Sequence, residues 1–489
     1  MSAFDELAAH QRETEALGNI SGLLGWDQEV MMPRGAGDQR AEEMAAIESV
    51  LHARRTDPRI EDWLVRAEAK DAAQARMLDL IARSYNRSTR IPARLATELA
   101  RLTSLSQGIW AQARADEDAS AFLPTLDEVV RLKREEAACV SDGDLYDALL
   151  DDYEPGASAK ELGAMFDRMR APLVELRDRV LGSDVKPQPL DMVFPENAQL
   201  RLARICASAF GYDWTRGRLD MSVHPFSSGG GDDARITTRI SESEPFGNIY
   251  STIHETGHAT YEQAIDPAYR FTPLGHGVSM GVHESQSRIC ENQLGRSSPF
   301  TGWLYTRMIE AFGDLGLDSP EAFHALVNRV EMGFIRTESD ELNYNLHIML
   351  RFDLERDLIA GKLEVADLEE AWNTRFKHDF GVSVTKPSQG FLQDVHWSVG
   401  LFGYFPTYAL GNVYAGCLDQ AMRKAEPDID AGLAKGDASA AKGWLDHNLR
   451  QFGGLRAPRD TIEHACGFAP NEKPLLDYLR QKFETIYRL

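Results

Sequence analysis

Residues 249–258 of the chain read Ile249-Tyr250-Ser251-Thr252-Ile253-His254-Glu255-Thr256-Gly257-His258. Ile249 and Ile253 recur at helical spacing, which predicts a helix over this stretch. Residues i and i+4 of a helix share a face, so the imidazoles of His254 and His258 can reach one cation. Glu255 lies three residues before His258 and faces the same ion, where its carboxylate can deprotonate a bound water. The pattern therefore predicts a catalytic metal site of the HEXXH type.

Two histidines leave a catalytic zinc one protein ligand short, and that ligand should be a His, Asp or Glu from a nearby element. The extended HExxHxxGxxH motif is excluded, because Tyr261 and Ala264 stand where it needs Gly and His. Within about 35 residues downstream, the spacing typical of such motifs, the candidates are Asp266, His276, His283, Glu284 and Glu291. Asp266 precedes a proline and is typical of a turn. A second helix is predicted over 282–289, where Glu284 would complete a His-His-Glu site; His283 and Glu291 stay open on spacing alone.

The rest of the chain predicts a mostly α protein. Apolar residues recur at helical spacing through the first 200 residues and again beyond residue 248, with breaks at residues 32–35 and 153–156. Residues 221–226 and 234–240 predict two short strands, joined by a glycine-rich hairpin loop at 227–232. One small antiparallel sheet is therefore expected near the middle of the chain. Nothing after the triple glycine matches a nucleotide-binding pattern.

Composition narrows the class of partner. The chain has 489 residues, with 53 Lys and Arg against 76 Asp and Glu, for a formal net charge of −23. Such acidity argues against nucleic acid or an anionic membrane surface as the main partner. No stretch approaches 18 consecutive apolar residues, and the N-terminus lacks the features of a signal peptide. The five cysteines lie far apart in the sequence, which fits a reducing compartment and predicts a cytoplasmic protein.

Further motifs make the chain resemble the carboxypeptidase Taq family of metallocarboxypeptidases over nearly its whole length. Besides the HEXXH motif, the family's segments appear in order as His224-Pro225-Phe226, Asp233-Ala234-Arg235-Ile236-Thr237, His283-Glu284-Ser285-Gln286, Ile335-Arg336-Thr337-Glu338-Ser339-Asp340 and Gly390-Phe391-Leu392-Gln393-Asp394-Val395-His396-Trp397. Trp26-Asp27-Gln28, Met32-Pro33 and residues 146–156 are also similar to family segments. Ser339 departs from the alanine usual in the family.

The resemblance implies a metal ion held by His254, His258 and Glu284, with Glu255 as the general base and acid. The ion would be Zn²⁺, or Co²⁺ or another divalent metal, with one per chain. The implied substrates are peptides with a free C-terminus, which lose single amino acids. The implied fold is one domain over 1–489, a helical body with a deep cleft like that of neurolysin and angiotensin-converting enzyme. Its N-terminal half would span about 1–215 and its metal-bearing half about 216–489, and the family also suggests a homodimer.

Peptide hydrolysis also requires a donor for the developing oxyanion. Peptidases of this clan place a His and a Tyr about a dozen residues apart for that purpose, which makes His396 and Tyr408 the candidates. Tyr404 is the rival of Tyr408, and spacing does not separate the two.

A carboxypeptidase must recognise a free carboxylate, and Arg suits this role because it is always charged and bonds bidentately. Arg336 is the choice that the family implies and Arg235 the second; the structural alternative pairs Arg336 with a neighbouring acid such as Glu338 or Asp340. His347 is expected on the same helix as Arg336. His224 and Gln393-Asp394 are expected to line the cleft or to support ligands.

Two other functions compete with a carboxypeptidase. An oligopeptidase of the same clan that cuts internally would use identical metal chemistry. A non-catalytic peptide-binding protein on the same fold is disfavoured, because Glu255 and all three ligand positions are present.

Overall fold

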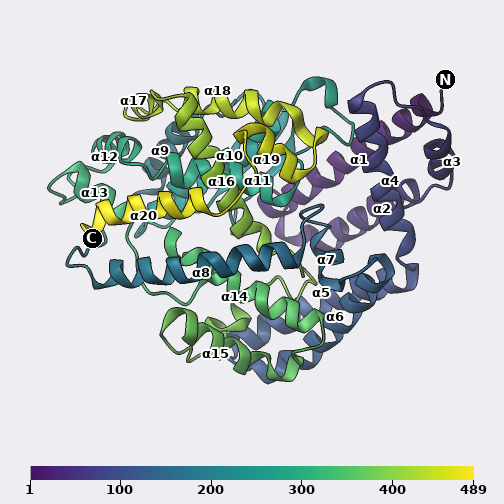
Figure 1. Cartoon of the computed structure of the whole chain (residues 1–489), viewed down its shortest axis with the longest axis horizontal. Helices are drawn as coiled ribbons and strands as arrows, with labels where there is room; N and C mark the ends of the chain where they lie inside the picture. Colours follow the sequence, from purple (N-terminus) through teal and green to yellow (C-terminus); the bar gives the residue numbers. More distant parts are fainter. Residues whose placement is uncertain (1) are drawn as a thin grey trace.

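Twenty α-helices carry most of residues 2–489, the part of the chain that the computed structural model describes (Figure 1). The first nine are α1 (Ala3–Val30), α2 (Gly37–Arg55), α3 (Arg59–Arg66), α4 (Ala72–Arg90), α5 (Ala93–Ala115), α6 (Ala119–Val140), α7 (Leu145–Leu150), α8 (Ala159–Gly182) and α9 (Glu196–Ala209). After a small sheet follow α10 (Phe246–Ala264), α11 (Met280–Arg288), α12 (Ser298–Phe312), α13 (Pro320–Val327), α14 (Glu341–Ile359), α15 (Leu368–Phe380), α16 (Pro406–Ala425), α17 (Ile429–Leu433), α18 (Ser439–Asn448), α19 (Pro458–Cys466) and α20 (Lys473–Tyr487). The prediction of a mostly α protein is confirmed.

Local chemistry sets where several of these helices begin and end. Ser2 and Asp5 form a capping box at the start of α1, each side chain accepting a backbone N–H of the other residue. The chain leaves α1 just before Pro33 and makes a short 3₁₀ turn at Arg34–Ala36, at the first predicted break. The second break follows α7, where Gly156 adopts a positive φ of 83° that side-chain-bearing residues rarely adopt.

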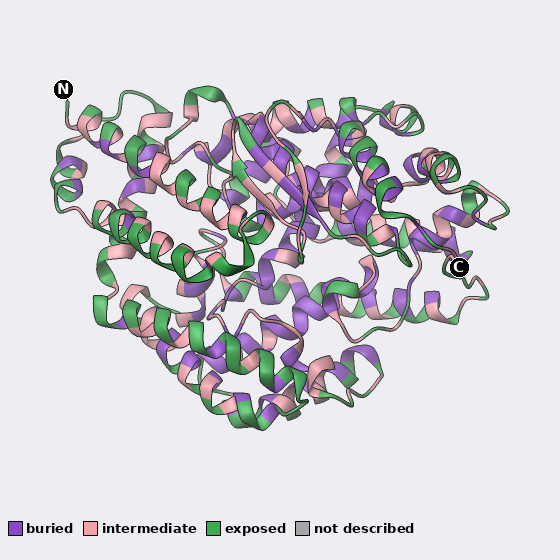
Figure 2. Ribbon diagram, turned by 180° about the vertical axis from the view of Figure 1, so that it is seen from behind, coloured by how far each residue is buried: buried purple, intermediate pink, exposed green. Residues whose placement is uncertain are grey.

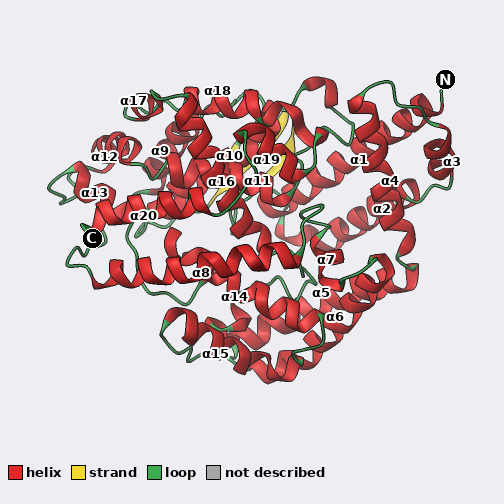
Figure 3. Ribbon diagram, viewed as in Figure 1, coloured by secondary structure: helices red, strands yellow, loops and turns green. Residues whose placement is uncertain are grey.

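The sheet differs in detail from the expected antiparallel pair. It has three strands in the order β1-β3-β2, with β1 at Leu219–Met221, β2 at Ser227–Gly230 and β3 at Asp233–Thr238 (Figure 3). β1 runs parallel to β3, whereas β2 runs antiparallel to it, so the sheet is mixed. The antiparallel partner of β3 is thus the glycine-rich segment predicted as a loop. The residues of β2 have low intrinsic strand propensity, so the sequence did not predict a strand here. The tight turn after Gly230 decides its pairing with β3.

The central helices approach one another closely where glycines replace larger side chains. A Cβ on Gly257 of α10 would lie 2.4 Å from the carbonyl oxygen of Gln286 on α11. A Cβ on Gly411 of α16 would lie 2.6 Å from Cγ of Glu284, also on α11. Figure 2 shows buried residues, in purple, concentrated along these central helices. The packing of α10, α11 and α16 therefore depends on hydrogen in place of a methyl group at both positions.

The two ends of the chain lie at opposite ends of the body (Figure 1). Near the N-terminus, α1, α3 and α4 share a small hydrophobic cluster of Leu7, Ile60, Trp63 and Ile81. Near the C-terminus, α20 packs against α8 and α16. No helix among residues 2–489 is both long and apolar enough to cross a membrane.

We expect Gly416→Ala to destabilise the protein, because its Cβ would lie 2.8 Å from the backbone N and Cα of Leu475 on α20. Overpacking of this kind costs about 1–3 kcal/mol, which exceeds the gain in helix propensity of about 1 kcal/mol. Gly443→Ala is the control, since that glycine lies inside α18 and an added methyl group would have no neighbour within 4 Å. Calorimetry should show a lower Tm for the first variant and a slightly higher Tm for the second. An unchanged or higher Tm for Gly416→Ala would show that α16 and α20 can separate freely.

Candidate metal centre

His254 and His258 lie one turn apart on α10, and Glu284 lies on α11 beside them. One ligand atom from each of the three residues lies within 4.8 Å of the other two. Oε2 of Glu284 is 3.7 Å from Nε2 of His254 and 3.6 Å from Nε2 of His258. Donors at about 2.0–2.2 Å from a tetrahedral zinc ion are themselves about 3.3–3.6 Å apart. The donor set and its spacing therefore fit a divalent ion with an open fourth position.

Residues from distant parts of the sequence position the helix that carries Glu284. Ser279 caps α11, with its hydroxyl accepting the backbone N–H of Val282. The buried carboxylate of Glu154 accepts the N–H of Gly281 at 3.0 Å and the hydroxyl of Tyr414 on α16 at 3.1 Å. A carboxylate at this end of a helix is favoured by the helix dipole. Glu154 therefore ties α11 to α16 from the turn at the second predicted break.

Glu291, one of the open candidates for the third ligand, lies behind His254 instead. Its Oε2 is 2.9 Å from Nδ1 of His254, the ring nitrogen that faces away from Glu284. It belongs to a π-helical turn, Ile289–Leu294, that continues α11. Arg288 donates to both Glu284, at 2.7 Å, and Glu291, at 3.2 Å. A carboxylate in this place fixes the tautomer and orientation of a ligand histidine, and spacing alone did not separate this role from direct ligation.

His283, the other open candidate, lies behind His258. The Nδ1 atoms of the two rings are 2.5 Å apart, and Nε2 of His283 is 2.9 Å from Oε1 of Glu262. Glu262 is one turn beyond His258 on α10. If Nε2 of His258 faces a cation, its Nδ1–H donates to His283, and His283 donates onward to the Glu262 carboxylate. The remaining candidates are occupied elsewhere: Asp266 accepts the N–H of Ala268 in a turn, and His276 pairs with Glu15 of α1.

The electrostatics of the centre favour a cation. Burial opposes ionisation of Glu284, but Arg288 and His254 outweigh it and hold the pKa of that carboxyl well below its usual range. Burial also opposes protonation of His254, yet Glu284 and Glu291 raise the pKa of its imidazole. Burial lowers the pKa of His258 to about 3, so this ring is neutral and can act as a ligand.

Glu255 points into the same group of charges from α10. It is 7% exposed, and burial raises the pKa of its carboxyl to about 7, with the neighbouring Glu284 and Glu291 acting in the same direction. His254 opposes this shift. Such a carboxyl takes up and releases protons near neutral pH more readily than an exposed glutamate.

Arg336 lies in a buried cluster of charges. Its Nε and Nη2 donate to Oδ1 of Asp394 at 3.0 and 2.9 Å, and its Nη1 donates to the hydroxyl of Tyr344 at 3.1 Å. Asp394 also accepts Nε of the fully buried Arg351 at 2.7 Å. The acid partner of Arg336 is thus Asp394, neither Glu338 nor Asp340, because the chain folds back to bring residue 394 beside it.

Gln393 supports Arg336 through the backbone. Its Oε1 accepts the N–H of Arg336 at 2.8 Å, while its Nε2 donates to the carbonyl of Phe334. Arg336 itself begins a 3₁₀ turn, Arg336–Glu338, that Asp340 separates from α14. His347 lies within α14, so the expectation that it shares a helix with Arg336 is wrong, because α14 begins only after its N-cap Asp340.

His396 and Tyr408 are brought together, with Tyr404 beside them. Nε2 of His396 is 3.3 Å from the hydroxyl of Tyr408, and the rings of Tyr404 and Tyr408 have centroids 5.3 Å apart. Burial lowers the pKa of His396 to about 4 and raises that of Tyr404 to about 12. Burial likewise raises the pKa of Tyr408. Both tyrosines therefore keep their protons at neutral pH and can donate them in hydrogen bonds.

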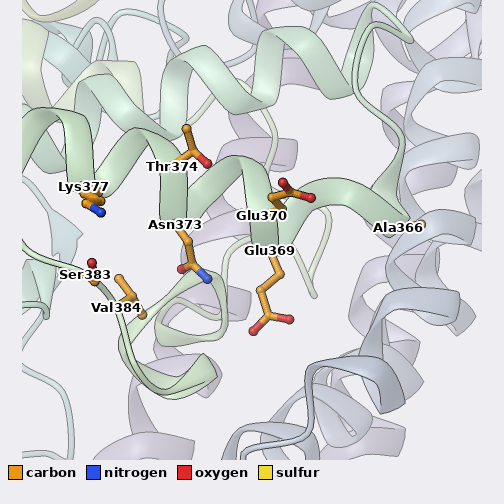
Figure 4. A pocket seen from close by; sticks show the side chains of 8 residues that line it. All are labelled: Ala366, Glu369, Glu370, Asn373, Thr374, Lys377, Ser383 and Val384. Carbon is orange, nitrogen blue, oxygen red and sulfur yellow. The ribbon is translucent and has the colours of Figure 1, made fainter.

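Arg235 and His224 have different surroundings. Arg235 on β3 pairs with Asp233 at 2.7 Å and stacks over Trp26 of α1, with its Cζ 4.2 Å from the ring centroid. His224 is exposed in the segment between β1 and β2. A surface pocket elsewhere on α15 involves none of the predicted site residues (Figure 4); its lining is Ala366, Glu369, Glu370, Asn373, Thr374, Lys377, Ser383 and Val384.

Comparisons with a family model, with known sequences and with solved structures all point to the same family. The family model described as carboxypeptidase Taq (M32) metallopeptidase matches residues 6–483. Thermostable carboxypeptidase 1 of Thermus thermophilus is 41% identical, over 99% of each chain. The crystal structure of an M32 carboxypeptidase from Deinococcus radiodurans has a TM-score of 0.96 at 37% identity, covering all of both chains. Metallocarboxypeptidase 1 of Trypanosoma cruzi has a TM-score of 0.95 at 33% identity, over 100% of this chain and 99% of the other.

We expect Glu291→Gln to weaken metal binding by about 10- to 100-fold, because the amide holds His254 less firmly and removes a negative charge. Competition with a chromogenic chelator measures the affinity. Glu310→Gln is the control, since that exposed carboxylate on α12 pairs with Arg307 across one turn, outside the candidate metal centre. Equal metal affinity in wild type and Glu291→Gln would show that Glu291 does not support a ligand.

Proposed function

Because the chain belongs to the carboxypeptidase Taq (M32) family of metallopeptidases and is a metallocarboxypeptidase, we propose that it releases single amino acids from the free C-termini of peptides. His254, His258 and Glu284 hold the metal ion in this proposal, and Glu255 is the general base and acid. The observation that carries it is the approach of these three donors on α10 and α11, with a buried glutamate beside them.

We propose Zn²⁺ as the ion, one per chain, with Co²⁺ or another divalent metal as a substitute. Two imidazoles and one carboxylate are a donor set typical of catalytic zinc. When bound, the ion polarises the scissile carbonyl and lowers the pKa of water. Neutral His258 and ionised Glu284 are already in the protonation states that such an ion requires.

Glu255 moves the proton in this mechanism. Its carboxylate takes a proton from the attacking water and delivers it to the nitrogen of the leaving amine. A carboxyl whose pKa is about 7 can perform both transfers near neutral pH. Burial of the side chain supports this role, because it excludes bulk water that would otherwise exchange the proton.

His396 and Tyr408 are the proposed donors to the developing oxyanion. Their proximity, with Nε2 of His396 3.3 Å from the Tyr408 hydroxyl, supports a shared function. The raised pKa of Tyr408 keeps the hydroxyl protonated, as a donor must be. Tyr404 remains the rival, since its ring lies against that of Tyr408.

Arg336 is the proposed receptor of the substrate's C-terminal carboxylate. Arg336, Arg351 and Asp394 together carry two positive charges and one negative charge in a buried place. The unbalanced positive charge would be compensated by an incoming carboxylate. Arg235 is the weaker candidate, because Asp233 already neutralises it. Gln393 supports the receptor by holding the backbone of Arg336, and a direct role for His224 in substrate binding stays a prediction.

We propose that residues 1–489 form one domain. Its support is a hydrophobic cluster that draws on α5 and α6 in the N-terminal half and on α10, α16 and α20 in the metal-bearing half. Assembly as a homodimer stays a prediction from the family resemblance. A cytoplasmic location is supported by the five cysteines, all of which are free.

We expect amidation of a peptide's C-terminus to lower kcat/KM by about 10- to 100-fold, the worth of a charge-assisted pair. Arg336→Ala should show the same loss on the free acid, and amidation should then cost nothing further. Arg336→Lys keeps the positive charge and should recover part of the activity. Steady-state kinetics on matched acid and amide peptides measure these values. If wild type cleaves both peptides equally well, the enzyme is an endopeptidase and has no carboxylate receptor. If kcat/KM on the free acid falls in Arg235→Ala and not in Arg336→Ala, Arg235 is the receptor.

We expect Tyr408→Phe to lower kcat by about 10²- to 10³-fold, as removal of one oxyanion donor does, with KM little changed. Tyr404→Phe is the matched variant, since it also removes one phenolic hydroxyl, from a neighbouring ring of similar burial. Its kcat should stay within about tenfold of wild type. The reverse ranking would make Tyr404 the donor, and unchanged kcat in both would refute an oxyanion role for either tyrosine.

A further inference from the structure

The segment 397–403 follows His396 and leads through Tyr404 toward Tyr408, so it lies between the two residues proposed to stabilise the oxyanion. We propose that Glu355 on α14 is the positioning residue that fixes both ends of this segment. Glu355 is fully buried and is not one of the residues predicted from sequence. The proposal rests on the roles proposed above for His396 and Tyr408.

Three donors converge on the carboxylate of Glu355. The indole Nε1 of Trp397 donates to Oε1 at 2.8 Å. The backbone N–H of Gly403 donates to Oε2 at 3.1 Å, and the hydroxyl of Tyr146 on α7 donates to the same oxygen at 2.7 Å. Trp397 is the residue after His396, and Gly403 is the residue before Tyr404. One side chain therefore holds the segment at its first and last residues.

A carboxylate satisfies all three donors, whereas an amide in the same place does not. The two N–H groups bind different oxygens, and neither can reverse its role, whereas an amide offers an acceptor on one side alone. No Lys or Arg side chain among the described residues hydrogen-bonds to Glu355, and burial raises the pKa of its carboxyl to about 7. A buried carboxylate without a cation is costly to stability. Its value lies in the geometry that it imposes on the segment.

At the Tyr404 end the segment is held by the Gly403 contact with Glu355, by a backbone hydrogen bond from Phe402 to Gly400 and by the buried ring of Phe402. Gly400 and Gly403 have φ angles of 76° and 84°, which side-chain-bearing residues rarely adopt. A Cβ on Gly403 would lie 2.7 Å from the backbone N of Leu150, so the segment passes directly over α7. Trp397 packs at the other end, with its ring stacked on Phe402 at a centroid distance of 6.2 Å. Loss of the Glu355 contacts would let both ends shift.

A small shift is enough to affect catalysis. The contact between His396 and Tyr408 spans 3.3 Å, at the long end of hydrogen-bond distances. A displacement of about 1 Å in a catalytic group can cost about 100-fold in rate. Glu355 touches none of the metal ligands through a hydrogen bond, so its effect should appear in turnover and not in metal binding.

Glu355→Gln tests the proposal. The amide group must face either Trp397 or Gly403, where it meets an N–H group in place of an acceptor. We expect kcat to fall by about 10- to 100-fold, with KM and bound metal within about twofold of wild type. Asp353→Asn is the matched control: it removes a carboxylate two residues away on α14, one that pairs with Arg170 and Arg375 and not with the segment. Its kcat should stay within about twofold. Unchanged kcat in Glu355→Gln would overturn the proposal. So would an equal fall in kcat in Asp353→Asn, or an effect of Glu355→Gln on KM or metal content in place of kcat.

Trp397→Phe provides a second route, needed if Glu355→Gln does not fold. It removes the indole donor but keeps an aromatic ring, and we expect it to lower kcat alone. The double variant should lose less than the product of the single losses, since both remove the same contact. A double variant whose loss in kcat equals the product of the two single losses would refute the proposal, as would unchanged kcat in Trp397→Phe. His396→Gln separates this result from the proposed function: unchanged kcat there would refute the role of His396 itself, whereas loss there without loss in Glu355→Gln would refute only the positioning role.

Discussion

The centre of this protein depends on how closely α10 approaches α11. The two helices touch at Gly257, where a methyl group would collide with the backbone at Gln286 and Ser287. That contact brings Glu284 beside His254 and His258, which a single helix could not do. The glycine inside the HEXXH sequence is therefore as important for the position of Glu284 as the helical spacing is for that of the two histidines. On the far side of Glu284, Gly411 permits the equally close approach of α16.

Charges around the centre form two groups of opposite sign. Glu255, Glu284 and Glu291 surround the histidines with Arg288 as their main cation, so this group attracts a metal ion. Arg336 and Arg351 share the single carboxylate of Asp394, so that group attracts an anion. Tyr344 lies between them, with the guanidinium of Arg288 over its ring and its hydroxyl bonded to Arg336. The net charge of the whole chain, which is strongly negative, says nothing about either group.

Much of the site could be predicted from sequence because its chemistry is local. The helical spacing of His254 and His258 follows from neighbouring residues, whereas the choice of Glu284 came from the family resemblance. The supporting residues could not be predicted in this way. Spacing offered Glu291 and His283 as ligands, and only the relative placement of two helices shows that they lie behind the proposed ligands His254 and His258. Glu154 and Glu355 act on residues far along the chain, where no periodic pattern connects them, and the pairing of Asp394 with Arg336 was not predicted for the same reason. The strand β2 was missed for a similar reason, since its pairing with β3 overrides its weak strand propensity.

Glu154 has a consequence for the order in which the protein can assemble during synthesis. It lies in the N-terminal half, yet it holds the start of α11, and its second partner is Tyr414 on α16. All three proposed ligands leave the ribosome well before α16 does. Until α16 arrives, Glu154 lacks one of its donors and the surface of Glu284 that Gly411 covers stays open. A nascent chain can therefore expose the metal-binding residues early, but it can enclose them only when most of the polypeptide has been made.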